Sequence, residues 1–292
     1  MKYSKPPTTF QEQIDILIKR GLNVEDPEKA LLNISIINYY RLSSYFPPFQ
    51  LNDHQFKENT SIDSIFELYD FDKKLRALIF RALENIEITL RTKIAYYFSH
   101  TYGPSAYCDP CNFSPGFNHA DWLAKLEESI NRTHEDYVKE FFKEYDEEKV
   151  LPIWIVIEII SFGQLSVMLR GLKRSDRKRI AEDCFGIDEA RLCSWVHTLV
   201  YIRNLCAHYS RIWNRTLAIK PMITKRLPEW KDISNHKIFC VFLIFKKLMI
   251  IPEQWEAWRN DLISLLEEYK NINTKMMGFP DDWQERLNCH KI

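Results

Sequence analysis

Glycine is scarce in this sequence, with 7 among 292 residues. Few glycines, together with long aliphatic and aromatic runs, argue against a turn-rich β fold and favour helices. Hydrophobic residues make up 46% and charged residues 27%, which is ordinary for a soluble globular protein. We therefore expect an all-α fold with a sizeable core.

Net charge is also lacking, because 40 basic residues balance 40 acidic ones. No overall field attracts a polyanion, so any RNA binding must use a local basic patch. The balance fits equally well a protein that has no polyanionic partner. Composition alone leaves both alternatives open.

Apolar runs long enough to cross a membrane are absent. The run at 150–160 is too short and contains Glu158, and two lysines interrupt the run at 238–251. Both runs indicate core helices. Residues 1–9 are polar and contain proline, unlike a signal peptide. We expect a cytoplasmic protein without a membrane partner.

Paired metal-ligand motifs are missing as well. The seven cysteines include one C-x-x-C, at Cys108 and Cys111, in a proline-rich loop. A structural zinc site needs a second pair of ligands at suitable spacing, which the nearby His100 and His119 do not form. We therefore expect free cysteines, no metal and no cofactor.

Apolar residues recur at three- and four-residue steps over 62–97, which predicts one long amphipathic helix. On this helix Glu87 and Arg91 are one turn apart and can pair, either to orient a site or as an ordinary surface ion pair. Shorter helices are expected at 9–20, 26–40, 121–145, 152–172, 188–213, 236–251 and 254–269. Residues 52–61 form either a hairpin or a loop, and 102–117 a loop. We expect an N-terminal helical extension at 1–60 and one compact all-helical domain at 61–292.

The expected helix at 188–213 concentrates positive charge. A helical wheel that starts at Arg203 places five polar residues at about 80° to 140°: His197, Asn204, His208, Arg211 and Arg215. No acidic residue occurs between Glu189 and Glu229. The other face is apolar and should pack against the core: Trp195, Ile202, Leu205, Cys206, Tyr209 and Trp213.

Arginine and histidine on one stripe suit a phosphate ligand and proton transfer. RNA carries its own nucleophile, the 2′-hydroxyl, so its cleavage needs only proton transfer and cationic stabilisation of the phosphorane. Arg203 and His208 lie about 140° apart on a straight helix, so they flank a groove rather than meet. A second copy across a two-fold axis would bring both to one phosphate. An R-x-x-x-x-H motif alone also occurs by chance.

A dense basic run occupies 173–179. Such runs are usually only solvated. The alternative is an RNA-contacting patch that begins with Lys173 and Arg174.

The chain resembles the Abi-like proteins of bacterial abortive infection (the AbiD/AbiF type), members of the HEPN superfamily. The resemblance spans almost the whole chain and includes the segments 37–45, 69–76, 86–93, 151–154, 161–166, 203–215, and 277–280 with Trp283. The most specific of them is 203–215. The resemblance implies a HEPN-like helical bundle with a ribonuclease site shared across a homodimer.

Within that site, the catalytic arginine and histidine of the family fall on Arg203 and His208, with the polar Asn204 beside them. The resemblance also implies a 2′,3′-cyclic phosphate product. It leaves open a non-coding RNA or an antitoxin as regulator.

Two functions follow. In the first, the protein is a metal-independent endoribonuclease, a toxin used in phage defence. RNA would be bound by Arg211, Asn214, Arg215, Lys173 and Arg174, and the site supported by Glu87, Arg91 and His197. In the second, the same stripe binds RNA or senses phage without cleaving.

Overall fold

The computed structural model describes residues 6–51, 53–223 and 227–288. Residues 1–5 of the polar N-terminal stretch and Asn52 lie outside these ranges. Within the described residues the chain forms α-helices and no strand, so the predicted all-α fold is confirmed. The helices are α1 (Phe10–Lys19), α2 (Pro27–Ile36), α3 (Tyr39–Ser43), α4 (Ile62–Tyr102), α5 (His119–Arg132), α6 (Asp136–Glu144), α7 (Ile153–Ile159), α8 (Phe162–Gly171), α9 (Arg174–Phe185), α10 (Glu189–Ala207), α11 (Phe239–Leu248), α12 (Pro252–Glu268) and α13 (Trp283–Leu287).

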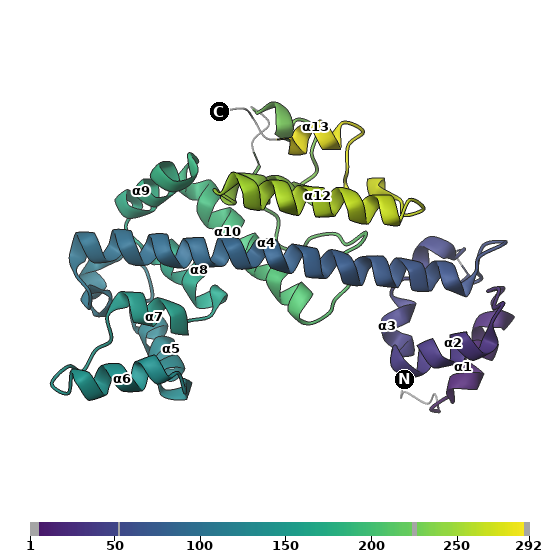
Figure 1. The fold of residues 1–292 in the computed structure, drawn as a ribbon, viewed down its shortest axis with the longest axis horizontal. Coiled ribbons are helices and arrows are strands. Elements are labelled where there is room, and N and C mark those ends of the chain that lie inside the picture. The colour runs from purple at the N-terminus through teal and green to yellow at the C-terminus, as the bar shows by residue number, and fades with distance from the viewer. Residues whose placement is uncertain (1–5, 52, 224–226, 289–292) are drawn as a thin grey trace.

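The long helix α4 is the axis of the molecule (Figure 1). Its 41 residues span about 60 Å. The helix begins after Ser61, whose side chain accepts a hydrogen bond from the Asp63 N–H, and it ends before Gly103, whose positive φ of 101° suits glycine. The predicted stripe is confirmed, and the helix continues five residues beyond the predicted end at 97.

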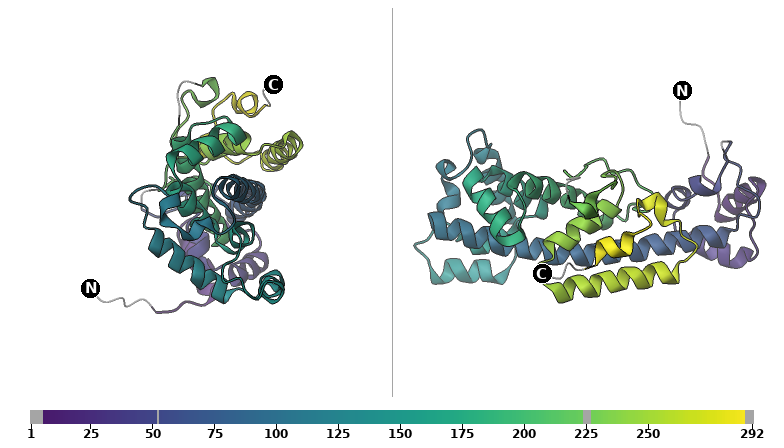
Figure 2. Two further views of the ribbon diagram at one scale, coloured as in Figure 1. Left: turned by 90° about the vertical axis from the view of Figure 1, so that its left-hand side faces the viewer. Right: turned by 90° about the horizontal axis from the view of Figure 1, so that it is seen from above.

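The other helices pack along α4. Helices α7, α9, α10, α11 and α12 contact it directly, and α10 also contacts α8 and α9. The purple helices α1–α3 lie near the N-terminal end of α4, and α5–α7 lie near its other end (Figures 1 and 2). No helix within the described ranges is long and apolar enough to cross a membrane.

Three of the predicted helices are each divided in two, and in two of them a side-chain cap marks the new start. The region 152–172 is interrupted at Ser161, which forms a capping box with Gln164 and starts α8. Inside 26–40 the Asn38 side chain accepts the Tyr40 N–H and starts α3. The region 121–145 is interrupted between α5 and α6, where Glu135 makes no side-chain cap. The basic run lies largely in α9. A single antiparallel bridge joins Gln50 and Phe56, and residues 53–61 contain no strand, so this described part of 52–61 fits the loop alternative.

The Asp72 carboxylate on α4 is fully buried and accepts hydrogen bonds from four groups. The Tyr45 hydroxyl donates at 2.6 Å, and Arg76 donates from one turn along α4. The backbone N–H groups of Ile212 and Trp213 donate at 3.1 and 2.6 Å. Burial raises the pKa of Asp72, and the charge of Arg76 and the other donors oppose that rise. One carboxylate therefore ties α4 to the segments that follow α3 and α10.

Replacement of Asp72 by alanine should lower the free energy of unfolding by about 3–5 kcal/mol, because the buried Arg76 and two buried amides lose their partner. Urea unfolding of the parent and the variant measures this loss. Asp121→Ala is the matched control, since it removes an i,i+4 partner of Lys125 from a pair that is more than half exposed. We expect a much smaller loss there. Equal losses in the two variants would contradict the anchoring role of Asp72.

Candidate functional site

Helix α10 ends at Ala207, so the predicted helix to Trp213 is wrong in its last turns. His208 is the C-cap residue, and Tyr209 has a left-handed φ of 55°. The N–H of Tyr209 donates to the Cys206 carbonyl at 3.0 Å and that of Ser210 to the Leu205 carbonyl at 2.9 Å. These two bonds form a Schellman motif, in which the left-handed position is usually glycine.

The cause of the early ending lies outside the helix. Asp72 accepts the N–H groups of Ile212 and Trp213, which continued helix would have directed at its own carbonyls. The wheel therefore does not extend past His208, and a single stripe from His197 to Arg215 does not exist. Tyr209, which was assigned to the apolar face, is 67% exposed instead.

A pocket of about 480 Å³ lies between α3 and the segment after α10. Its lining combines cationic, hydroxyl and amide groups: Asn38, Tyr40, Arg41, Ser44, Tyr45, His208, Tyr209, Ser210, Arg211 and Arg215. Three arginines and a histidine are present, and the lining contains no carboxylate. We call this the cationic pocket. Its charge and shape suit an anion that can accept several hydrogen bonds.

The arginines of the cationic pocket are fixed by backbone carbonyls. Arg41 donates to the Tyr209 carbonyl at 2.6 Å, Arg211 to the Ser44 carbonyl at 2.5 Å, and Arg215 to the Arg211 carbonyl at 2.6 Å. Burial, together with the nearby Arg215, lowers the pKa of Arg211. A guanidinium has five N–H donors, so each arginine keeps donors for a ligand.

Asn214 and Lys237 lie next to this pocket. Asn214 has a left-handed φ of 52°, which asparagine tolerates better than most residues. Its side-chain oxygen accepts a hydrogen bond from Lys237 Nζ at 2.8 Å. Burial and the charge of Arg211 lower the pKa of Lys237. The local field is therefore positive on this side as well.

Arg203 and Asn204 occupy the last turns of α10, before His208. Arg203 donates to the Asn204 side-chain oxygen at 3.4 Å, and the Asn204 carbonyl accepts the N–H of His208 at 3.0 Å. The lining of the cationic pocket includes His208 but not Arg203. One chain thus brings His208, Arg211 and Arg215 together and leaves Arg203 beside them on the helix.

His197 lies two to three turns earlier on α10 and faces another pocket, of about 360 Å³, together with Arg170. Its side chain is half-buried, and burial and the charge of Arg170 lower its pKa from the ordinary 6.5. The structure therefore places His197 apart from the residues that line the cationic pocket.

Lys173 and Arg174 lie at the other end of α10 from His208. Arg174 pairs at 2.6 Å with Glu189, the first residue of α10, and Lys173 Nζ is 5.1 Å from the Tyr102 ring centroid. The 19 residues of α10 span about 28 Å. An RNA-binding role for these two residues stays a prediction, and it concerns a surface separate from the cationic pocket.

Arg91 is largely buried and binds the end of α7. It donates to the carbonyls of Ile157 and Ile160, the latter at 2.8 Å, and pairs with Glu87. The pair is therefore not an ordinary surface ion pair. Its contacts hold α7 against α4, and support of the site by Glu87 and Arg91 stays a prediction.

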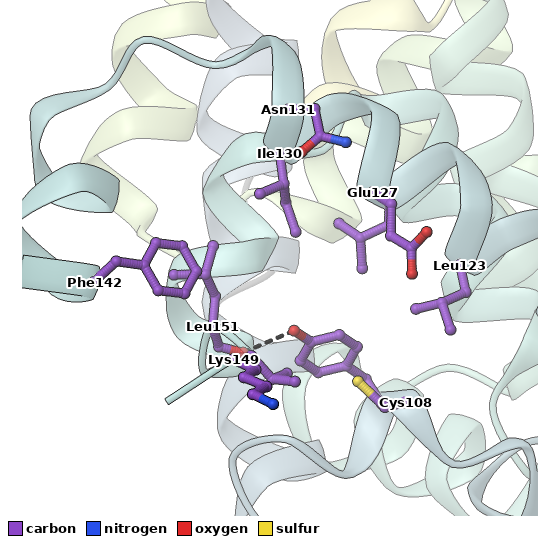
Figure 3. A pocket seen from close by; sticks show the side chains of 11 residues that line it. Cys108, Leu123, Glu127, Ile130, Asn131, Phe142, Lys149 and Leu151 are labelled. Atoms are coloured by element: carbon purple, nitrogen blue, oxygen red, sulfur yellow. Dashed lines mark hydrogen bonds between the residues drawn. The ribbon is translucent and has the colours of Figure 1, made fainter. Parts of the chain in front are cut away.

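Cys108 lines a third pocket, of about 350 Å³, which is mostly apolar (Figure 3). Tyr107 also lines this pocket, and its hydroxyl donates to the Leu151 carbonyl at 2.7 Å. Burial raises the pKa of the Cys108 thiol, whereas Cys111 is exposed. Within the described part of the chain, no group of three or more His, Cys, Asp or Glu side chains could hold a metal ion.

Sequence reasoning missed Arg41, Tyr45 and Asp72 as parts of this site. All three lie in segments that carry the family resemblance, at 37–45 and 69–76. Their chemistry was hidden because their partners are distant in the sequence. Arg41 and Asp72 bind backbone groups 168 and 140 positions away, and Tyr45 binds the Asp72 side chain 27 positions away.

The fold and the cationic pocket define an all-helical protein with a pocket suited to an anion. Residues 33–214 match the model of the Abi-like protein family, and this range contains every helix from α3 to α10 and most of the cationic pocket. The chain therefore belongs to the Abi-like protein family. A search of curated proteins gave no match, and neither did a search of solved structures.

The lowered pKa of His197 predicts a pH effect on stability. The folded state disfavours the protonated imidazole, so below about pH 6.5 the unfolded state binds more protons. Stability should therefore fall as the pH falls through this window. His197→Gln should flatten that part of the profile, measured by urea unfolding at several pH values between about 7 and 5. Parallel profiles for the parent and the variant would contradict this assignment.

Proposed function

We propose that this protein is a metal-independent endoribonuclease that acts in defence against phage. The observation that carries the proposal is the cationic pocket, where His208 lies among Arg41, Arg211 and Arg215 without a carboxylate. A phosphodiester is an anion that such a pocket attracts, and histidine is the side chain best suited to transfer protons near neutral pH. Membership of the Abi-like family supports the role in defence.

In the proposed reaction, the 2′-oxygen of RNA attacks the adjacent phosphorus and gives its proton to a base. The 5′-oxygen of the next nucleotide leaves and takes a proton from an acid. The products are a 2′,3′-cyclic phosphate and a 5′-hydroxyl. The proposed step therefore consumes no water and requires no metal ion. His208 transfers protons, and Arg203 stabilises the charge of the phosphorane, with Asn204 positioning Arg203. Arg211 and Arg215 hold the RNA backbone.

A homodimer completes the proposed site. Arg203 lies outside the lining of the pocket that contains His208 of the same chain. Two α10 helices related by a two-fold axis would place Arg203 of one chain against His208 of the other. Each of the two sites would then combine Arg203 of one chain with His208 of the other, and that histidine would take the proton from the 2′-hydroxyl and give it to the leaving 5′-oxygen.

The parent protein should cleave RNA in the presence of EDTA. His208→Ala should lower the cleavage rate about 10²- to 10⁴-fold, because proton transfer is lost. Gel assays measure the rate, and end analysis should find 2′,3′-cyclic phosphates. A single 2′-deoxy substitution at the cleaved position should block cutting there, because the nucleophile is missing.

Arg132→Ala is the control for this experiment, since Arg132 is exposed on α5, paired with Glu128, and unrelated to the pocket. Its rate should equal that of the parent. Cleavage by His208→Ala at the parental rate would refute the role of His208. RNA binding by the parent without any cleavage would show that the protein is a non-catalytic RNA-binding module and not an enzyme.

The shared site predicts complementation between two inactive variants. A dimer of either variant alone lacks one of the two residues in both of its sites. In a mixed dimer, one site combines the intact Arg203 of the His208→Ala chain with the intact His208 of the Arg203→Ala chain. A 1:1 mixture that has exchanged subunits should recover about a quarter of the parental rate. The measurement is the cleavage rate of the mixture against each variant alone. A mixture as inactive as its components would show that both residues act within one chain.

A further inference from the structure

Two aromatic side chains border the cationic pocket and are strongly exposed. Tyr40, on α3, is 86% exposed and Tyr209, after α10, is 67% exposed. No other aromatic side chain in the described part of the chain is as exposed as either of them. Both line the same pocket as Arg41, Arg211 and Arg215. Exposed aromatic surface forgoes the free energy of burial, so its concentration beside three arginines indicates a ligand that covers it.

The backbone at Tyr209 supports the same conclusion. Tyr209 holds the left-handed position of the Schellman motif, with φ 55°, where glycine or asparagine would be free of steric strain. A bulky residue in that conformation costs on the order of 1 kcal/mol. The fold therefore retains a strained tyrosine whose ring it does not bury. Strain of this kind occurs at functional positions.

Arg41 fixes this tyrosine from the opposite side of the pocket. Its guanidinium donates to the Tyr209 carbonyl at 2.6 Å and lies 6.0 Å from the centroid of the Tyr209 ring. The Tyr209 backbone is thus held at the rim of the pocket, with a guanidinium near the ring. Tyr40 precedes Arg41 in the chain, so α3 supplies both the Tyr40 ring and the arginine that contacts Tyr209.

We propose that Tyr40 and Tyr209 are stacking surfaces for unpaired bases, and that Arg41, Arg211 and Arg215 bind the phosphates of the same strand. The ligand class is single-stranded RNA. Aromatic rings above a cationic groove recognise single strands in this way, because each base offers a flat π-face and each phosphate a charge. Bases within a duplex are stacked and paired already, so neither ring could reach them. This inference rests on the proposed function and names the form of its substrate.

The experiment uses the full chain and a short RNA-like oligonucleotide of mixed sequence with 2′-O-methyl groups, which cannot be cleaved through the 2′-oxygen. Fluorescence anisotropy gives its Kd as a single strand and after annealing to its complement. The parent should bind the single strand more tightly. Tyr40→Ala and Tyr209→Asn should each raise Kd about tenfold, the effect of one lost base stack.

Two sets of controls separate stacking from other effects. Tyr40→Phe and Tyr209→Phe keep the rings, so they should bind as the parent does. Asparagine at position 209 tolerates the left-handed conformation, so Tyr209→Asn removes the ring without disturbing the turn. Tyr145→Ala removes an exposed tyrosine that directly follows α6 and does not line the cationic pocket, so it should leave Kd unchanged.

The proposal is overturned if the parent binds duplex as tightly as the single strand, or if the oligonucleotide does not bind. It is also overturned if Tyr40→Ala and Tyr209→Asn retain the parental Kd. Because the probe cannot be cleaved, the result is independent of catalysis. Ring-dependent binding in a protein that fails to cut unmodified RNA would uphold the stacking surfaces and refute the ribonuclease, and the reverse result would do the opposite.

Discussion

The rest of the site depends on one buried carboxylate. Asp72 has no exposure to solvent, and it is satisfied by a tyrosine hydroxyl, a guanidinium and two backbone amides. Removal of a carboxylate from water is costly unless all its acceptor positions are used. The fold meets this demand by drawing in Tyr45 from one side and the amides of Ile212 and Trp213 from the other. The cationic pocket forms where these two segments meet above α4.

This constraint explains why a short helix near the N-terminus takes part in the site. Tyr45 is fixed by Asp72, and the neighbouring Ser44 carbonyl accepts a hydrogen bond from Arg211. Arg41 in turn holds the Tyr209 carbonyl. The arginines therefore donate hydrogen bonds to carbonyl groups that a loop would otherwise leave to water. They remain charged, and the lining of the pocket contains no carboxylate partner for them. A protein of zero net charge thus carries a local concentration of positive charge. A protein with balanced charge needs such a local basic patch if it is to bind RNA.

Features that arise from local periodicity could be predicted from the sequence. The apolar spacing on α4 predicted a long helix, and the scarcity of glycine predicted the all-α class. The end of α10 could not be predicted, because the hydrogen bonds that divert the chain come from Asp72, about 140 residues earlier. Arg41 was missed for a similar reason, since its partner Tyr209 is 168 positions away. The helical wheel consequently placed Tyr209 on a packed face, whereas the structure exposes it. The motif residues Arg203 and His208 are predicted from their spacing and from the charge of the helix as well as from the family resemblance, and their catalytic roles stay predictions.

Asp72 thus fixes the segment after α10 and so builds the pocket. Native-state hydrogen exchange at the amides of Ile212 and Trp213 tests this claim most directly. Although both lie outside any helix, they should be protected to the level of the α4 core, because they are buried and bound to Asp72. Exchange of these two amides at the rate of an open surface loop would contradict the account.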